Sequence, residues 1–312
     1  MSSRVLKSAV ALLALSMFTS VAAATLKDVN VTYVQSPLNV PSIVEKARGV
    51  FASHYEKYGL GVKYAPLTAG PEQTAALASG DLQFLNAVGG TSVIIAAANG
   101  ADVKIISMYS RSPRAFMMFS NDTSLNSPAA LKGKTIAGPK GTNLHELLSA
   151  YLKKGGLSVN DVNFVNMGIP ASLAALENGS VDVALLAGPA AYNCMKSGKH
   201  LITNGDGLIA ALIATATSQK FSDEHPELVN EFLTAQKEVL DFMAQNHDEA
   251  MKMTAEATHL SPEAVEEMYG MYDFSAEITE KDLKDLDSTQ QFLLESGMIQ
   301  KGVDTKTLLL KR

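Results

Sequence analysis

The chain has 312 residues, a formal net charge of −6 and one cysteine, Cys194. The acidic balance argues against binding to nucleic acid or to an anionic membrane surface. The single cysteine excludes an intramolecular disulfide and a cysteine-based metal cluster, and the six histidines include no pair at metal-ligand spacing. The sequence therefore predicts neither a metal nor any other cofactor.

The first 24 residues have the pattern of a secretory signal peptide. Arg4 and Lys7 precede the apolar stretch 9–18, which is too short to span a bilayer, and the small residues 21–24 offer a cleavage site. Cleavage would remove both basic residues and change the net charge from −6 to −8. This pattern favours export to the periplasm as a soluble protein over an N-terminal membrane anchor or a buried helix.

Strands and helices alternate along most of the remaining chain. The residue pattern predicts strands at 29–34, 61–67, 82–87, 103–109, 115–119, 134–137, 162–165, 181–186 and 208–217. It predicts helices at 42–49, 71–80, 93–98, 144–154, 170–178 and 190–196, and from residue 222 onward helices alone, among them 248–258, 261–269 and 280–296. A rhythm of strand, helix and strand indicates mostly parallel sheets with crossover helices.

Residues 76–86 and 175–185 are near-copies of one another. Each reads as the end of a helix, a glycine stop and a short apolar strand. One chain that builds the same unit twice suits two lobes facing each other across a cleft. We therefore predict an α/β fold of two lobes. Its parts are a signal peptide at 1–24, a first lobe at 25–113, a second lobe at 114–214, and a return to the first lobe with the C-terminal helices at 215–312.

The loops at the carboxyl ends of the predicted strands are rich in small polar residues. Ligands of open α/β sheets bind there, where glycine lets backbone N–H groups approach and helix dipoles favour negative charge. The candidate ligand contacts in these loops are Ser36, Asn39, Gly70, Gly90, Thr91, Ser92, Thr142, Asn143 and Gly188. None of the loops has a nucleotide-binding pattern. Each alone also fits an ordinary connection, but together they predict a cleft for an anion or a polar small molecule.

Two larger side chains are further candidates. Arg111 follows a strand in the segment that joins the lobes, where it could hold a carboxylate, sulfonate or phosphate in a bidentate clamp, or pair with a carboxylate at the surface. Tyr192 could stack on a ligand or belong to the rim of the core. His145 has no identifiable Ser, Cys or Asp companion, so the sequence gives little support to catalysis.

Short segments spread over nearly the whole mature chain carry a family resemblance. They are 43–51 with 59–62, 75–82 with 96–100, 131–137 with 140–142, 155–157 with 161–162, 174–176 with 179 and 181–182, and 225–229 with 232–233. In order and spacing they resemble the periplasmic solute-binding proteins of ABC transporters. Within these, the resemblance is to the nitrate/sulfonate/taurine-binding group, which shares its fold with the NMT1/THI5-like proteins.

The resemblance implies a monomer of two lobes with two hinge crossings, which closes on a small sulfonate, carboxylate or similar ligand. It also implies delivery to a membrane permease and an ATPase. Two departures from the family pattern concern specificity: Gln83 stands where an acid is common, and the small residues 187–188 stand where a large aromatic residue is common. The smaller residues are expected to leave room for a ligand bulkier than taurine or nitrate.

Two other functions stay open at this point. The first is a ligand-sensing subunit that reports to a membrane receptor. The second is a protein that binds a pyrimidine precursor of the thiamine pathway, or an enzyme of that pathway on the same fold. One cysteine without a histidine pair, together with an export signal, argues against the enzyme.

Overall fold

The computed structural model describes residues 26–311, so the predicted signal peptide lies outside the described residues. The strands are β1 Asp28–Thr32, β2 Gly61–Ala65, β3 Leu85–Gly89, β4 Lys104–Arg111, β5 Phe116–Ser120, β6 Thr135–Gly138, β7 Asn163–Asn166, β8 Val183–Ala187, β9 His200–Asn204 and β10 Leu212–Thr217. The α-helices are α1 Val40–Arg48, α2 Val50–Glu56, α3 Gly70–Ser79, α4 Gly90–Ala98, α5 Asn143–Lys154, α6 Ile169–Glu177, α7 Gly188–Lys196, α8 Gln219–Glu224, α9 Pro226–Gln245, α10 His247–Thr258, α11 Pro262–Tyr269 and α12 Glu280–Glu295.

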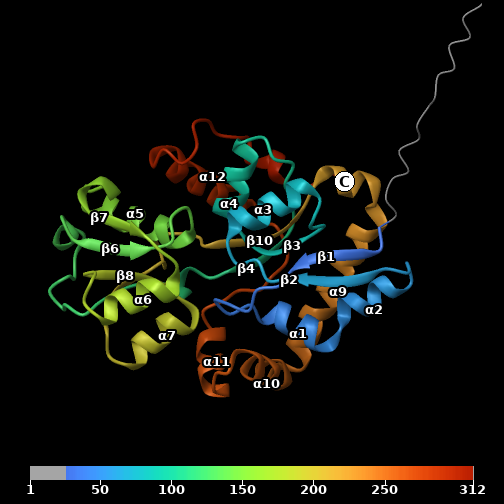
Figure 1. Cartoon of the computed structure of the whole chain (residues 1–312), viewed down its shortest axis with the longest axis horizontal. Coiled ribbons are helices and arrows are strands. Elements are labelled where there is room, and N and C mark those ends of the chain that lie inside the picture. The colour runs from blue at the N-terminus through green and yellow to red at the C-terminus, as the bar shows by residue number, and fades with distance from the viewer. Residues whose placement is uncertain (1–25, 312) are drawn as a thin grey trace, which may run out of the picture.

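The second lobe is built on a five-stranded sheet of order β7-β6-β8-β5-β9, at the left of Figure 1. Because side chains alternate along a strand, β8 supplies both faces of this sheet. Leu185 joins Leu144 and Leu148 of α5 on one face, and Leu186 joins Leu176 of α6 and Ala191 of α7 on the other. The sheet is therefore covered by α5 on one side and by α6 and α7 on the other (Figure 1).

The first lobe contains two smaller sheets. Strands β1 and β2 pair in parallel, and β3-β10-β4 form a second sheet. Val29 and Val31 of β1 pack in a core with Phe232 of α9, while Leu85 of β3 packs in another with Leu293 of α12.

Among residues 26–311 no helix combines the length and the apolar character needed to cross a membrane.

The chain crosses between the lobes twice, from β4 to β5 and from β9 to β10, which confirms the predicted two-lobed α/β fold. The sheets are less parallel than predicted. Strand β10 runs antiparallel to both β3 and β4, and β5 runs antiparallel to β8 and β9. The cause is the crossing itself, since a strand that carries the chain over from the other lobe enters between its neighbours from the opposite direction.

Three elements differ from the sequence prediction. Helix α2 and strand β9 were not predicted. The C-terminal part is also not purely helical, because residues 273–276 lie beside β4. There Arg111 and Asp273 exchange backbone hydrogen bonds of 2.8 and 2.9 Å, and the Met108 N–H donates to the Ala276 carbonyl. Strand β4 offers these backbone groups to a segment that local patterning cannot identify as its partner.

Candidate ligand-binding site

A cavity of about 140 Å³ lies between the lobes, and we call it the polar pocket. The structure brings together in its wall seven of the predicted contact residues, namely Ser36, Asn39, Gly70, Thr91, Ser92, Thr142 and Asn143. Residues that were not predicted as contacts also line it, including Gln73, Ser110, Ser112, Phe116, Ile213 and Tyr272. Ser110 and Ser112 carried a usable signal, because residues two apart in an extended segment face the same side.

Four helices begin at the polar pocket. Its wall includes Asn39 before α1, Gly70 at the start of α3, Thr91 and Ser92 in the first turn of α4, and Asn143 at the start of α5. None of these four N-termini is capped by its own N-cap side chain. The first turn of a helix leaves N–H groups without a partner inside the helix and carries a partial positive charge, so the pocket suits an anion.

The close approach of α3 and α4 depends on one glycine. A Cβ atom at Gly70 would lie 2.1 Å from the Ser92 hydroxyl oxygen and 2.6 Å from the Ser92 Cβ. Only a residue without a side chain allows the two helix starts to meet at this distance. Gly70 therefore positions Ser92 in the pocket wall rather than binding a ligand through a side chain.

Three residues that line the polar pocket each carry a buried polar atom with no hydrogen-bond partner within residues 26–311. These atoms are Oε1 of Gln73, the hydroxyl oxygen of Ser112 and the hydroxyl oxygen of Tyr272. Burial raises the pKa of Tyr272, so its hydroxyl stays protonated and able to donate. Buried polar atoms are normally paired, and three unpaired ones around a single cavity indicate that a polar ligand completes them.

No Asp, Glu, Lys, Arg or His lies among the described residues that line the polar pocket. The electrostatic character of the pocket therefore comes from the helix ends and from hydroxyl and amide groups. Such a pocket can hold one negative charge through oriented dipoles, but it offers no counter-charge for a cation.

Arg111 is placed differently from the predicted clamp. Its Nε and Nη2 donate to the two carboxylate oxygens of Asp282, each at 2.6 Å, and its remaining donors reach the carbonyls of Ser275 and Glu277 at 2.9 and 2.7 Å. Asp282 sits in the first turn of α12 with only 1% of its side chain exposed. The guanidinium is thus occupied by the first lobe's own C-terminal region, and Arg111 anchors α12 instead of lining the pocket.

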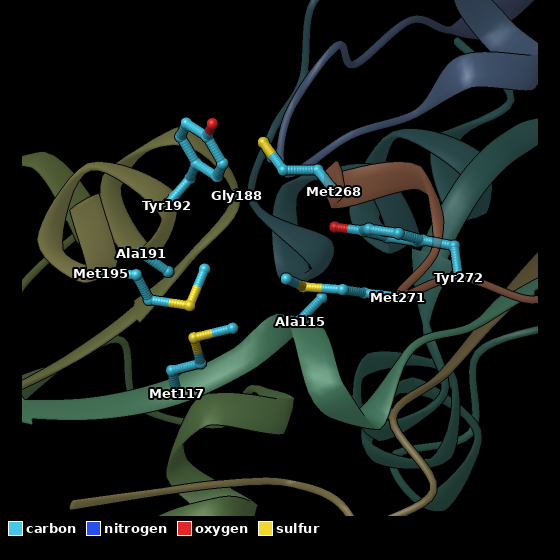
Figure 2. A pocket seen from close by; sticks show the side chains of 9 residues that line it. All are labelled: Ala115, Met117, Gly188, Ala191, Tyr192, Met195, Met268, Met271 and Tyr272. Atoms are coloured by element: carbon cyan, nitrogen blue, oxygen red, sulfur yellow. The ribbon is translucent and has the colours of Figure 1, made fainter. Parts of the chain in front are cut away.

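Gly90, Gly188 and Tyr192 also lie outside the wall of the polar pocket. A Cβ atom at Gly90 would meet Leu286 of α12 at 3.2 Å, so this glycine packs against the helix layer. Gly188 and Tyr192 line a neighbouring cavity of about 10 Å³ (Figure 2). The Tyr192 hydroxyl donates to Glu267 of α11 at 3.3 Å, which accounts for its position.

Four of the nine residues that line the neighbouring cavity are methionines, and we call it the methionine pocket. Met117, Met195, Met268 and Met271 project into it from both sides, as Figure 2 shows. Tyr272 lines both this cavity and the polar pocket. The extra room expected at residues 187–188 is not available to a ligand, because Gly188 lies against the Pro37 backbone: a Cβ there would be 2.5 Å from the Pro37 carbonyl oxygen.

The C-terminal helices touch the second lobe on both sides of the cleft. On one side, Lys196 of α7 pairs with Glu267 of α11 at 2.6 Å. On the other, the Thr289 hydroxyl of α12 donates to Oε1 of Glu146 in α5 at 2.8 Å. These contacts bridge the lobes in the arrangement that the structure describes.

Replacing Glu146 by Gln is expected to stabilise the protein in a pH-dependent way. Burial raises the pKa of Glu146 from 4.5 to about 7, and its Oε2 has no partner within the described residues. Because the folded carboxyl holds its proton to higher pH than the unfolded one, wild-type stability falls as the pH rises from about 4.5 to 7. The glutamine keeps the bond from Thr289 without ionising.

Thermal or urea unfolding at several pH values measures this effect. We expect the free energy of unfolding of Glu146→Gln to exceed that of wild type by roughly 2 kcal/mol at pH 8 and by little at pH 4.5. Glu72→Gln is the matched control, because Glu72 is an exposed acid in the first turn of α3. If the stability difference between Glu146→Gln and wild type did not change with pH, the raised pKa of Glu146 would be contradicted.

A two-lobed α/β chain with two crossings and a ligand pocket between the lobes has the architecture of the periplasmic binding proteins. The model of the family described as "NMT1/THI5 like" matches residues 37–250. The chain belongs to this family.

Two relatives illustrate the similarity in sequence. A Bacillus subtilis (strain 168) protein named for aliphatic-sulfonate binding is 30% identical over 288 residues, covering 91% of this chain and 86% of that protein. The taurine-binding periplasmic protein of Escherichia coli (strain K12) is 30% identical over 207 residues, covering 65% of this chain and 63% of that protein.

Two solved structures share the fold. The alkanesulfonate-binding protein SsuA from Xanthomonas axonopodis pv. citri, bound to MOPS, superposes with a TM-score of 0.82 at 21% identity, covering 93% of this chain and 100% of that chain. The desulfurization enzyme DSZB superposes with a TM-score of 0.66 at 15% identity, covering 91% and 96%. The same architecture therefore serves both binding proteins and an enzyme.

Proposed function

We propose that this protein binds a small organic sulfonate between its lobes in the periplasm and delivers it to the permease and ATPase of an ABC transporter. The observation that carries the proposal is the polar pocket, where four helix N-termini and unpaired hydroxyl groups converge without any charged side chain. A sulfonate brings one negative charge and only acceptor oxygens, which matches a wall of donors. The names of the two sequence relatives support the same ligand class.

The size of the polar pocket limits the ligand. At about 140 Å³ it is close to the engineered cavity of roughly 150 Å³ that holds benzene, a molecule of six heavy atoms. A sulfonate group with about two or three carbons is of similar size. We therefore expect short-chain sulfonates to bind in preference to long alkyl or aryl ones.

Closure of the lobes provides the mechanism. Thr142 and Asn143 belong to the second lobe, whereas Ser36, Thr91 and Ser92 belong to the first, so one ligand contacts both. A ligand that binds the closed form better than the open form shifts the population toward closure. The closed form then presents a combined surface of both lobes to a membrane partner.

We further propose binding without catalysis. The fold is shared with an enzyme, but the one cysteine of this chain, Cys194, lies in α7 with 2% of its surface exposed. Burial raises the pKa of its thiol, which disfavours the nucleophilic thiolate. Cys194 also does not line the polar pocket.

Isothermal titration calorimetry tests the proposed function. The panel comprises methanesulfonate, ethanesulfonate, propanesulfonate and octanesulfonate, with nitrate, acetate and a pyrimidine as competitors of other classes. We expect micromolar or tighter binding of the short sulfonates, with no turnover when product formation is followed by mass spectrometry. Binding of a pyrimidine or a carboxylate instead of any sulfonate would contradict the proposal.

Replacing Ser92 by Ala is expected to weaken sulfonate binding by about 1 kcal/mol, or roughly fivefold, through loss of one hydroxyl donor. Ser92 is 5% exposed and lines the polar pocket. Ser79→Ala is the control, because Ser79 is an exposed serine at the far end of α3. Equal affinities for the Ser92→Ala variant and wild type would remove this hydroxyl from the site.

A further inference from the structure

Gln73 lines the polar pocket and carries an acceptor that a sulfonate cannot satisfy. Gln73, in the first turn of α3, is 2% exposed, and its Nε2 donates to the Leu67 carbonyl at 2.8 Å. This bond fixes the orientation of the amide, because the reversed amide would place two carbonyl oxygens against each other. Oε1 is left buried, without a partner in the part of the chain that the structure describes.

A ligand that forms a hydrogen bond with Gln73 Oε1 must carry a hydrogen-bond donor. A carbonyl oxygen only accepts, and so do the oxygens of a sulfonate, so the donor has to sit elsewhere on the ligand. The hydroxyls of Ser112 and Tyr272 are also unpaired, and each of them both donates and accepts. These two hydroxyls can therefore pair with a donor or with an acceptor of the ligand. Among the three unpaired groups, Gln73 alone requires a donor.

The donor has to be uncharged. An ammonium group in this pocket would lose its water without meeting a carboxylate, since no acidic side chain lines the wall. The four helix N-termini add positive potential and oppose a cation further. A hydroxyl group supplies the donor without a charge.

We infer that the ligand is a short hydroxyalkanesulfonate whose hydroxyl donates to Gln73 Oε1, and that Gln73 makes the pocket select against the aminoalkanesulfonate of the same length. This inference rests on the proposed function and deepens it. It makes Gln73 the specificity-determining residue at the end of the ligand opposite the sulfonate.

Three ligands that differ at one terminal position test the inference by calorimetry. They are ethanesulfonate, 2-hydroxyethanesulfonate and 2-aminoethanesulfonate. We expect the hydroxy compound to bind roughly 10-fold tighter than ethanesulfonate and roughly 100-fold tighter than the amino compound, because unpaired polar groups and unpaired charges are both penalised in a buried site. Equal or tighter binding of the amino compound to the wild-type protein would overturn the inference.

Two variants locate the effect at Gln73. In Gln73→Met the hydroxy compound should lose its advantage over ethanesulfonate. Disturbance of the loop at Leu67 would weaken both ligands alike and leave their ratio unchanged, so the ratio reports the hydroxyl contact itself. In Gln73→Glu the new carboxylate should improve binding of the amino compound about 10-fold.

The outcomes separate two kinds of failure. A hydroxy-to-ethanesulfonate ratio that is the same in Gln73→Met and wild type overturns the inference and leaves sulfonate binding intact. If none of the sulfonates binds the wild-type protein, the proposed function fails, and the inference fails with it. Melting temperatures of both variants identify any loss of folding, and the Gln73→Glu gain cannot arise from unfolding.

Discussion

Replacing Arg111 by Ala is expected to lower the free energy of unfolding by about 3 kcal/mol, because it leaves a buried carboxylate without its partner. Asp282 is 1% exposed and receives two bonds of 2.6 Å from the guanidinium. Loss of Arg111 also frees the Ser275 and Glu277 carbonyls, so the segment before α12 loses its attachment to β4. Urea unfolding of wild type and variant measures the difference.

Arg114→Ala is the matched control for Arg111. Arg114 lies three residues further along the same crossing, is exposed, and within residues 26–311 donates only to the Gly270 carbonyl. Its removal should change stability by about 0.5 kcal/mol or less. Adding Asp282→Asn to Arg111→Ala should recover part of the loss, because the unpaired charge disappears. If Arg111→Ala abolished sulfonate binding without lowering stability, the ligand clamp predicted from the sequence would be restored.

Replacing Gly188 by Ala is expected to weaken ligand binding at least roughly 100-fold by preventing the lobes from closing. The new Cβ would lie 2.5 Å from the Pro37 carbonyl oxygen and 2.7 Å from its Cα, across the boundary between the lobes. Gly188 also has a φ of +62°, which adds backbone strain. A penalty of about 3 kcal/mol on the closed form corresponds to the stated loss of affinity.

A second glycine separates strain from closure. Gly179 lies in the same lobe with a φ of +74°, and no atom lies within 4 Å of its added Cβ. Gly179→Ala should therefore lower stability without changing affinity. Calorimetry gives the affinities, and small-angle scattering with saturating ligand should show Gly188→Ala remaining more extended than wild type. Similar affinities for the two variants would show that the Pro37 contact does not control closure.

The sequence by itself determined the alternation of strands and helices, the two lobes and seven residues of the polar pocket. Those features rest on local signals. Hydrophobic periodicity identifies strands and helices, and small polar residues before a helix mark an N-terminus that has to find partners. Asn39, Thr91 and Asn143 could be chosen because each lies at or near such a helix start, whatever the rest of the chain does.

Partnerships between distant segments were decided only by the tertiary structure. For Arg111 the sequence left both a ligand clamp and an ion pair open, because its partner, Asp282, lies 171 positions away in the sequence. Tyr272 reaches the pocket from a segment predicted to be helical, which instead pairs with β4. Gln73 lies in a segment predicted only as a helix, and the bond from its amide to the Leu67 carbonyl depends on the folded loop before that helix. A side chain's role depends on which donors and acceptors remain unpaired after folding, and that balance is set by the packing of the whole chain.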